Sequence, residues 1–470
     1  MIKGAVYGVK RLSRKLIVRQ MLQMLPRLSM DNIIRIIDMG ERLLSREDHR
    51  EVAESAKNYI QEGHPAVKVI ERVLHELSPE CRFRTIYNLF ILALLSETSF
   101  REELNATEGF RPPFFFVISP TMRCNLNCYG CYAGEYEQSF GLSHEVLDRI
   151  LREALDLGIH FVTFSGGEPF IRGDIFDFFE KYRDMIFQIY TNGTLIDEEM
   201  ADRLSHLGNV APIISVEGLE ETTDLRRGKN HFHRIMHVMD LLREKGVLFG
   251  ASVTQTRQNY LEISGDEFAD LMVEKGVYLI WYFQYIPIGR RPDLSLMLTP
   301  QQRDEVRRRL GRIRSTRPFF ICDFWNDGPY VDGCLAGGRE YFHINANGDV
   351  EPCVFVHFAV DNIYKKSLKE VLNSPFFKGI RARQPFSENP LTPCMIIDQP
   401  QQLRELVERY GARPTHPGAE TLLGELAPEL DRYAEEYHAI ARESWEREYE
   451  PEGFKKHGKI LEVRASNGAS

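Results

Sequence analysis

From residue 114 onward, short apolar runs alternate with amphipathic helical segments. The apolar runs predict strands at 114–119, 161–165, 187–190, 212–216, 248–253 and 279–286. Helices are predicted between them, near 143–157, 174–184, 197–206, 231–245 and 266–275. Strands that alternate with helices form parallel sheets with right-handed crossovers. We therefore expect an α/β fold, a partial (β/α)6 TIM-like barrel, with its chemistry on the loops that follow the strands.

The segments on either side of this core have different patterns. Residues 31–110 are predicted to be helical, and Pro112-Pro113 ends that pattern. Residues 318–400 are richer in Gly, Pro and Cys, and Asn347-Gly348 predicts a two-residue hairpin turn. We predict four segments: a helical N-terminal module at 1–112, the barrel core at 113–300, a small cysteine-containing domain at 301–400 and a charged helical tail at 401–470.

The composition excludes several classes of protein. Of the 470 residues, 43% are apolar and 27% are charged, which is ordinary for a globular protein. No apolar run approaches the roughly 20 residues that a bilayer span needs. A net charge of −9 argues against nucleic-acid binding by a basic field. Eight cysteines are too few for a disulfide scaffold, so we expect a reducing, cytoplasmic setting in which clustered cysteines bind metal or react.

The first thirty residues form a basic amphipathic pattern. They hold seven Lys/Arg and no Asp or Glu, and their apolar residues share one helical face: Ile2, Val6, Val9, Leu12 and Leu16. Such a helix either lies on an anionic membrane surface or packs on its own protein with a solvated basic face. A peripheral membrane contact through residues 1–30 is therefore one of two expectations. An organellar transit peptide shares this composition.

The loop after the first predicted strand contains Cys124, Cys128 and Cys131 in a C-x3-C-x2-C spacing. Three thiolates this close together converge on a soft-metal target. Structural zinc usually takes four ligands. Three cysteines instead suit a four-iron cluster in which one iron lacks a protein thiolate. That iron can bind a substrate directly, and a zinc site completed by a distant ligand is the alternative.

The second predicted strand ends in Ser165-Gly166-Gly167-Glu168-Pro169. Two glycines let a ligand approach the backbone closely. Backbone carbonyls together with the Glu168 carboxylate can hold an ammonium group. Alone this segment is a weak signal, and a plain turn is the alternative. Its place one βα unit after the three-cysteine loop makes it a strong one.

These two motifs resemble those of the radical S-adenosylmethionine (radical SAM) superfamily. The likeness covers about 114–300 and continues after the third strand at 191–194, after the fourth at 215–218, and at 224–228. The resemblance implies a [4Fe–4S] cluster on the three cysteines whose open iron chelates S-adenosylmethionine. It implies contacts from Gly166, Gly167 and Glu168 to the methionyl ammonium, and from Ser215 and Arg227 to the ribose or carboxylate.

The resemblance also implies an activity and departs from the family pattern in two places. The reduced cluster would cleave S-adenosylmethionine to a 5′-deoxyadenosyl radical, which abstracts a substrate hydrogen atom. A flavodoxin- or ferredoxin-like protein would donate the electron. The family often has an aromatic residue before its third cysteine, where this chain has Gly130; Tyr129 and Tyr132 are the candidates for that role. Glu217 stands where an Asp is usual.

Four further cysteines lie in the 301–400 region: Cys322, Cys334, Cys353 and Cys394. Two of them bracket the predicted hairpin, which resembles the start of the auxiliary-cluster extension called SPASM, or twitch when it is shortened. The resemblance implies a second, auxiliary [4Fe–4S] cluster on these cysteines. Buried thiols or structural zinc are the alternatives. Cys81 is predicted to be a core thiol.

The substrate remains open at this stage. Auxiliary-cluster relatives often modify peptides, which favours a peptide or protein. The basic N-terminal pattern favours a membrane lipid or isoprenoid instead, and a small cofactor precursor is a third option. A different class of protein is a non-catalytic iron–sulfur or zinc-binding protein on a degenerate barrel. The retained Gly166-Gly167-Glu168 argues against that class, because a structural metal needs no amino-acid clamp.

Overall fold

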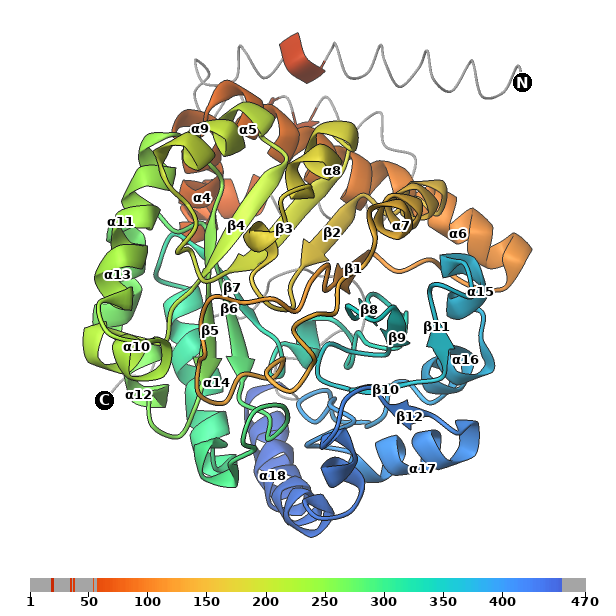
Figure 1. Cartoon of the computed structure of the whole chain (residues 1–470). Coiled ribbons are helices and arrows are strands. Elements are labelled where there is room, and N and C mark those ends of the chain that lie inside the picture. Colours follow the sequence, from red (N-terminus) through yellow and green to blue (C-terminus); the bar gives the residue numbers. More distant parts are fainter. Residues whose placement is uncertain (1–17, 21–33, 36, 39–53, 55–56, 450–470) are drawn as a thin grey trace.

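The computed structural model describes residues 18–20, 34–35, 37–38, 54 and 57–449. Apart from 18–20, the predicted basic helix of residues 1–30 lies outside the described residues, as does the chain after 449. Helices precede the first strand, as predicted: α4 (Pro65–His75), α5 (Pro79–Arg84), the π-helical η2 (Thr85–Ser96) and α6 (Glu97–Glu108). Figure 1 shows α4 and α5 at the end of β3 and β4 opposite the loop that follows β1, and α6 on the outer side of α7.

Six parallel strands form the core: β1 (Phe115–Ile118), β2 (Phe161–Phe164), β3 (Ile186–Thr191), β4 (Val210–Ser215), β5 (Gly250–Gln255) and β6 (Leu279–Gln284). Their connecting helices are α7 (His144–Asp156), α8 (Ile175–Lys181), α9 (Glu198–Leu207), α10 (Glu220–Arg227), α11 (His231–Glu244), α12 (Tyr260–Ile263) and α13 (Asp266–Glu274). The predicted α/β partial barrel is confirmed. Figure 1 shows the helices outside the curved sheet.

Strands from the later segment extend this sheet at both edges. β7 (Phe320–Asp323) pairs parallel to β6, and β8 (His343–Ile344) pairs parallel to β1. β8 forms the predicted hairpin with β9 (Asp349–Glu351), and β11 (Asp361–Asn362) pairs with β9. The order is β11-β9-β8-β1-β2-β3-β4-β5-β6-β7. The cysteine-containing segment therefore contributes strands to the barrel sheet.

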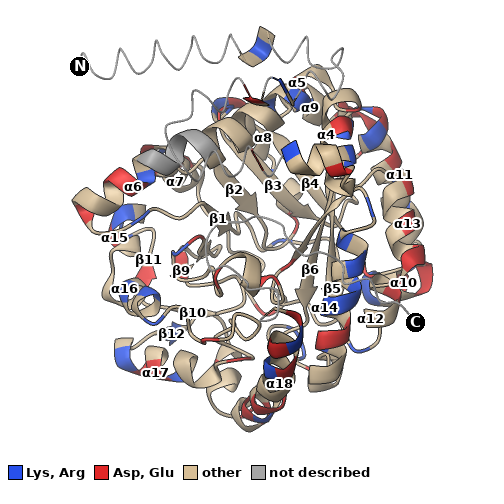
Figure 2. Ribbon diagram, turned by 180° about the vertical axis from the view of Figure 1, so that it is seen from behind, with Lys and Arg blue, Asp and Glu red and all other residues tan. Residues whose placement is uncertain are grey.

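The sheet divides its side chains between two faces. Charged residues lie on the outer helices, and the strands β1 to β6 contain none (Figure 2). Phe164, Phe187 and Ile189 point outward into a fully buried layer beneath the helices. The alternate residues, such as Thr163 and Gln188, face the barrel interior. This alternation follows from the period of two along a strand.

The C-terminal helices close the structure below the barrel. α14 (Pro300–Arg314) packs on α18 (Ala427–Glu448), with α15 (Leu368–Leu372), α16 (Pro375–Ala382) and α17 (Pro400–Tyr410) alongside. The short strands β10 (Phe358–Ala359) and β12 (Arg413–Pro414) pair antiparallel. Arg303 of α14 is fully buried, where it pairs with Asp398 and lies 3.7 Å from the Tyr437 ring centroid. Within the described ranges, no helix is long and apolar enough to cross a bilayer.

Candidate active site

A cavity opens at the ends of the strands that carry the motifs. Cys124, Cys128 and Cys131 line it, together with Gly166 and Gly167. The three thiols are half-buried and free of disulfides. The cysteines and the glycine pair therefore face one common space, although they come from loops after different strands.

The glycine turn holds the cysteine loop by direct backbone contact. The Gly167 N–H donates to the Thr121 carbonyl at 3.0 Å, and the Glu168 N–H donates to the Arg123 carbonyl at 2.8 Å. A Cβ at Gly167 would lie 2.1 Å from the Arg123 oxygen. Gly166 has a φ of +97°, and its Cβ would lie 2.7 Å from the Thr121 oxygen. Only glycine fits both positions.

The Glu168 side chain lies behind the cavity wall. Its carboxylate accepts hydrogen bonds from the Thr191 hydroxyl at 2.9 Å, the Asn192 N–H at 2.8 Å and the Phe170 N–H at 3.1 Å. The residue is only 1% exposed, and burial raises the pKa of its carboxyl. Glu168 is absent from the cavity lining, whereas Gly166 and Gly167 are part of it. Its contacts join the ends of β2 and β3.

Two adjacent arginines of α10 connect the fourth strand to the cysteine loop. Both pair with the buried Glu217 carboxylate. Arg226 also donates to the Tyr129 carbonyl at 3.1 Å, and Arg227 Nη1 lies 4.0 Å from Cys128 Sγ. Burial would raise the pKa of Glu217, but the two guanidinium groups outweigh it and hold that pKa below its ordinary value. The motif reasoning identified Arg227 and missed Arg226.

Ser215 ends β4 and lines the same cavity, where its hydroxyl lies 3.4 Å from that of Ser252 on β5. Ser215 and Arg227 therefore line the same cavity. The two side chains come from one βα connection, so their shared placement follows from β4 and α10.

The space beside Gly130 belongs to Tyr285, which follows β6. Gly130 has a φ of +64°, and a Cβ there would come within 2.9 Å of the Tyr285 ring. Tyr132 lines the cavity, and its hydroxyl lies 2.6 Å from that of Ser165. Tyr129 is 41% exposed and donates to Asp293 instead. Of the two tyrosines considered for the aromatic role, Tyr132 is the one at the cavity.

The inner part of the cavity is an uncharged aromatic chamber. We use this name for the lining residues Phe115, Val117, Thr163, Gln188, Tyr190, Trp281, Phe283, Phe324, Tyr341, Val354 and Phe355. Neighbouring rings in it touch, as in the stacked pair Trp281–Phe283 with centroids 5.8 Å apart. The charged residues of the whole lining are Arg226, Arg227 and Arg290, which all contact the cysteine loop.

One polar atom in the chamber has no hydrogen-bond partner among the described residues. Thr163 Oγ1 is buried at the inner face of β2, and the residue is only 1% exposed. By contrast, the Gln188 amide accepts from Trp281 Nε1 at 3.3 Å and donates to the Tyr190 hydroxyl at 3.2 Å. A buried polar atom without a partner costs free energy.

The later cysteines lie behind the chamber. Cys353 follows β9, and the Tyr341 hydroxyl donates to its sulfur at 2.6 Å. Cys334 is near enough to Cys353 and to Cys394 to interact electrostatically with each of them. Burial raises the pKa of Cys353 to about 12. Metal binding would remove these protons, because only the thiolate is a ligand.

Cys322 has a different environment. It lies on β7 opposite Trp281, and its charged neighbours are Asp327, Arg314 and Asp323. Burial raises its pKa to about 12. In the part of the chain described, no three His, Cys, Asp or Glu side chains are arranged to hold a single metal ion. An iron–sulfur cluster is larger than one ion, so its thiolates need not meet at one point.

The fold and the cysteine-lined cavity define an iron–sulfur protein with a partial barrel. Residues 118–262 match the model of the radical SAM superfamily, and residues 334–395 match an iron–sulfur cluster-binding domain, SPASM. The chain belongs to the radical SAM superfamily. It is 31% identical to the Fe-coproporphyrin III synthase of Methanosarcina barkeri over 57% of this chain and 76% of that protein. It is 28% identical to the mycofactocin maturase MftC of Mycobacterium tuberculosis, over 59% and 74%.

Solved structures agree on the fold. The Streptococcus suis protein SuiB bound to S-adenosylmethionine superposes with a TM-score of 0.52 at 20% identity, covering 74% of this chain and 84% of that one. The chain is thus an enzyme of the radical SAM class. Its cofactors are a [4Fe–4S] cluster and S-adenosylmethionine, with additional iron–sulfur binding in the SPASM domain.

Proposed function

We propose that this enzyme removes a hydrogen atom from an uncharged group held in the aromatic chamber. The observation that carries the proposal is the shared cavity: the three motif cysteines, the glycine pair and the chamber all open into it. Cys124, Cys128 and Cys131 would hold the [4Fe–4S] cluster. When bound and reduced, the cluster with S-adenosylmethionine supplies a 5′-deoxyadenosyl radical. A flavodoxin- or ferredoxin-like donor would deliver the electron.

The residues around the cysteine loop would bind and orient S-adenosylmethionine. Gly166 and Gly167 leave the backbone open to its methionyl end, and Ser215 offers a hydroxyl. Arg227 carries a positive charge beside Cys128. The three donors to Glu168 support a role in shaping this wall. The aromatic chamber excludes water from the reacting atoms.

The later cysteines would hold an auxiliary [4Fe–4S] cluster. Cys334, Cys353 and Cys394 are the ligands we propose, because all three lie within the match to the iron–sulfur cluster-binding domain and Cys334 interacts electrostatically with each of the other two. Cys322 is the remaining cysteine of this region and the candidate for a fourth ligand. The four-segment division with boundaries at 112, 300 and 400 also remains our proposal, and the two family matches fall within its second and third segments.

The cellular compartment and the membrane contact are two separate proposals. The eight free cysteines support a reducing, cytoplasmic compartment. The peripheral membrane contact, and with it a lipid or isoprenoid substrate, depends on residues 1–30, of which the structure describes only 18–20. We therefore base the substrate proposal on the chamber.

We propose a peptide substrate that presents an uncharged side chain. The names of some similar proteins indicate a peptide substrate, such as the PqqA peptide cyclase of Bradyrhizobium diazoefficiens. An extended peptide can place one side chain in the chamber and leave its charged termini outside. Thr163 Oγ1 would then find a polar partner on the substrate.

A tetrapyrrole is the second candidate, because the relative at 31% identity is named for coproporphyrin. The several carboxylates of a coproporphyrin need cationic side chains as partners. The three arginines of the cavity already pair with Glu217 or donate to backbone carbonyls, such as Arg290 to the Cys128 carbonyl at 3.2 Å. Because these arginines are already engaged, the charges of the cavity lining favour an uncharged peptide side chain over a tetrapyrrole.

The first experiment tests the clusters. Anaerobically prepared protein should contain about eight iron per chain, and the Cys124/Cys128/Cys131→Ala variant about four. Only the wild type should release 5′-deoxyadenosine with reductant and S-adenosylmethionine. Cys81→Ala is the matched control, since Cys81 is a buried thiol in another cluster of the core, and it should keep all its iron. Zinc in place of iron would contradict the proposal.

The second experiment tests the substrate class. A pool of short deuterated peptides is offered, and the transfer of deuterium into 5′-deoxyadenosine is followed by mass spectrometry. We expect transfer from peptides with uncharged aromatic or aliphatic side chains and its loss in Trp281→Arg, with the iron content unchanged. Titration with Fe-coproporphyrin III, followed by its Soret band, should show no saturable binding. Saturable binding with conversion would favour the tetrapyrrole instead.

A further inference from the structure

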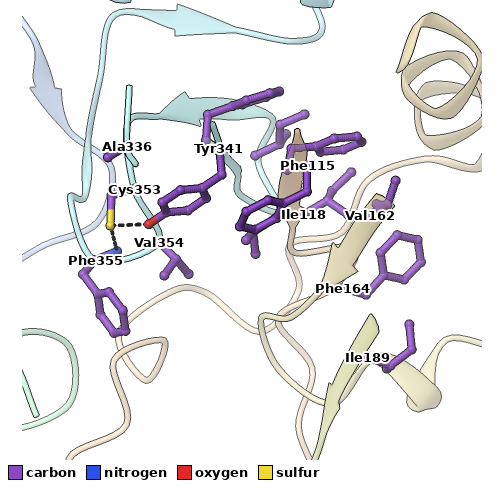
Figure 3. Close-up of a cluster of buried hydrophobic side chains, with 14 of the residues drawn as sticks. Phe115, Ile118, Val162, Phe164, Ile189, Ala336, Tyr341, Cys353, Val354 and Phe355 are labelled. Carbon is purple, nitrogen blue, oxygen red and sulfur yellow. Dashed lines mark hydrogen bonds between the residues drawn. The ribbon is translucent and has the colours of Figure 1, made fainter. Parts of the chain in front are cut away.

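The Tyr341 side chain lies between the rest of the aromatic chamber and Cys353. Its ring lines the cavity and stacks on Phe115, with centroids 5.2 Å apart and planes 8° from parallel. Its hydroxyl points the other way and donates to Cys353 Sγ at 2.6 Å (Figure 3). The residue is 1% exposed. One side chain therefore contacts both the proposed substrate space and a proposed cluster ligand.

The position of Tyr341 is strongly constrained. Its N–H donates to the Leu335 carbonyl at 3.1 Å, which ties it to the turn after Cys334. Two residues later the chain enters β8, which pairs with β1. The Phe324 ring meets the Tyr341 ring edge-on at 5.8 Å. Contacts from three segments hold the ring, so the hydroxyl has little freedom to turn away from the sulfur.

Two further sulfur contacts in this region come from the backbone. The Phe355 N–H lies 3.5 Å from Cys353 Sγ, and the Ile396 N–H donates to Cys394 Sγ at 3.3 Å. The Tyr341 bond is shorter and comes from a hydroxyl. Hydrogen bonds to the sulfur ligands raise the reduction potential of an iron–sulfur cluster, because they stabilise the additional negative charge of the reduced form.

We propose that Tyr341 is a positioning residue that raises the reduction potential of the auxiliary cluster through its hydrogen bond to Cys353. This inference rests on the proposed function, because it takes Cys353 as a cluster ligand. Tyr341 belongs neither to the three-cysteine loop nor to the glycine turn. The residue that faces the substrate space would also set how readily the auxiliary cluster accepts an electron.

The test compares Tyr341→Phe with its parent in the Cys124/Cys128/Cys131→Ala background, so that only the auxiliary cluster contributes to the signal. The substitution keeps the ring and removes the hydroxyl. We expect an unchanged iron content of about four per chain and a shift of the midpoint potential to a lower value, measured by redox titration with electron paramagnetic resonance. Tyr282→Phe is the matched control, because it removes a buried hydroxyl that donates to the Ile263 carbonyl. Its potential should not move.

Four outcomes decide the matter. A lower potential in Tyr341→Phe alone supports the inference. An unchanged potential with full iron overturns it and leaves the proposed function standing. A parent without iron overturns the inference and the proposed auxiliary cluster, because Cys353 then binds no cluster, and it leaves the proposed hydrogen abstraction untouched. If Tyr341→Phe alone loses iron, the tyrosine holds the ligand in place without tuning the cluster, and the inference is likewise overturned.

Discussion

Gly167 lies against the backbone of Arg123, so closely that a Cβ at 167 would come within 2.1 Å of the Arg123 carbonyl oxygen. The Glu168 N–H donates to that same oxygen at 2.8 Å. The turn after β2 thus supports the residue that immediately precedes Cys124. The missing side chain of Gly167 therefore allows the two loops to make backbone contact.

Gly167→Ala should therefore displace the cysteine loop. The clash is with backbone atoms, so it cannot be relieved by a side-chain rotation, and overpacking of this kind costs about 1–3 kcal/mol. We expect iron to fall from about eight to about four per chain and 5′-deoxyadenosine formation to be lost. Gly173→Ala is the control, since a Cβ there meets nothing within 4 Å. Full iron in Gly167→Ala would refute this account of the turn.

The buried pair of Arg303 and Asp398 should be needed for the auxiliary site. Asp398 Oδ2 accepts the Cys394 N–H at 2.9 Å. Arg303→Ala leaves that carboxylate buried without its cation, which costs about 3–5 kcal/mol. We expect a lower unfolding temperature and selective loss of the auxiliary iron. Arg312→Ala removes a pair with Asp266 in which both side chains are about half exposed, and it should cost at most about 1 kcal/mol.

Asp304 gives a pH-dependent prediction. Burial would raise the pKa of Asp304, but Arg307, Ser444 and Arg308 outweigh it and hold that pKa below its ordinary value. Its contribution is therefore complete above the unfolded pKa of about 3.9 and is lost as the pH falls through the lower folded value. Asp304→Asn should lower the free energy of unfolding by about 1.5–3 kcal/mol at pH 7. Denaturant titrations should show the same difference at pH 5 and a smaller one below pH 4.

Thr163→Val should not destabilise the protein without substrate. The hydroxyl is buried and has no partner among the described residues, so removing it relieves an unmet hydrogen bond. We expect an unfolding temperature equal to or above that of the wild type, with weaker deuterium transfer from peptides. Ser119→Ala is the contrast, because the Ser119 hydroxyl lies 2.8 Å from His343 Nε2. That variant should lose about 1–3 kcal/mol, and an equal loss in Thr163→Val would count against a polar contact to the substrate.

The sequence alone determined the class of protein and the architecture of its core. The six strands lie where the apolar runs are, and Asn347-Gly348 forms the turn between β8 and β9. Both depend on short-range patterns, namely side-chain periodicity and turn chemistry. The cysteine spacing and the glycine pair are local as well, so they identified the superfamily and its cofactors.

Only the tertiary structure decided which residues meet across the sheet. β7 pairs with one edge of the six-stranded core and β8 with the other. Arg226 and Arg227 both pair with Glu217. The Glu168 carboxylate accepts hydrogen bonds from Thr191 and Asn192. Arg303 and Asp398 form their pair across 95 residues. Each of these contacts depends on strand order and helix packing, which no local pattern contains. The aromatic chamber and the Tyr341–Cys353 bond arise in the same way, from side chains that the curved sheet brings together.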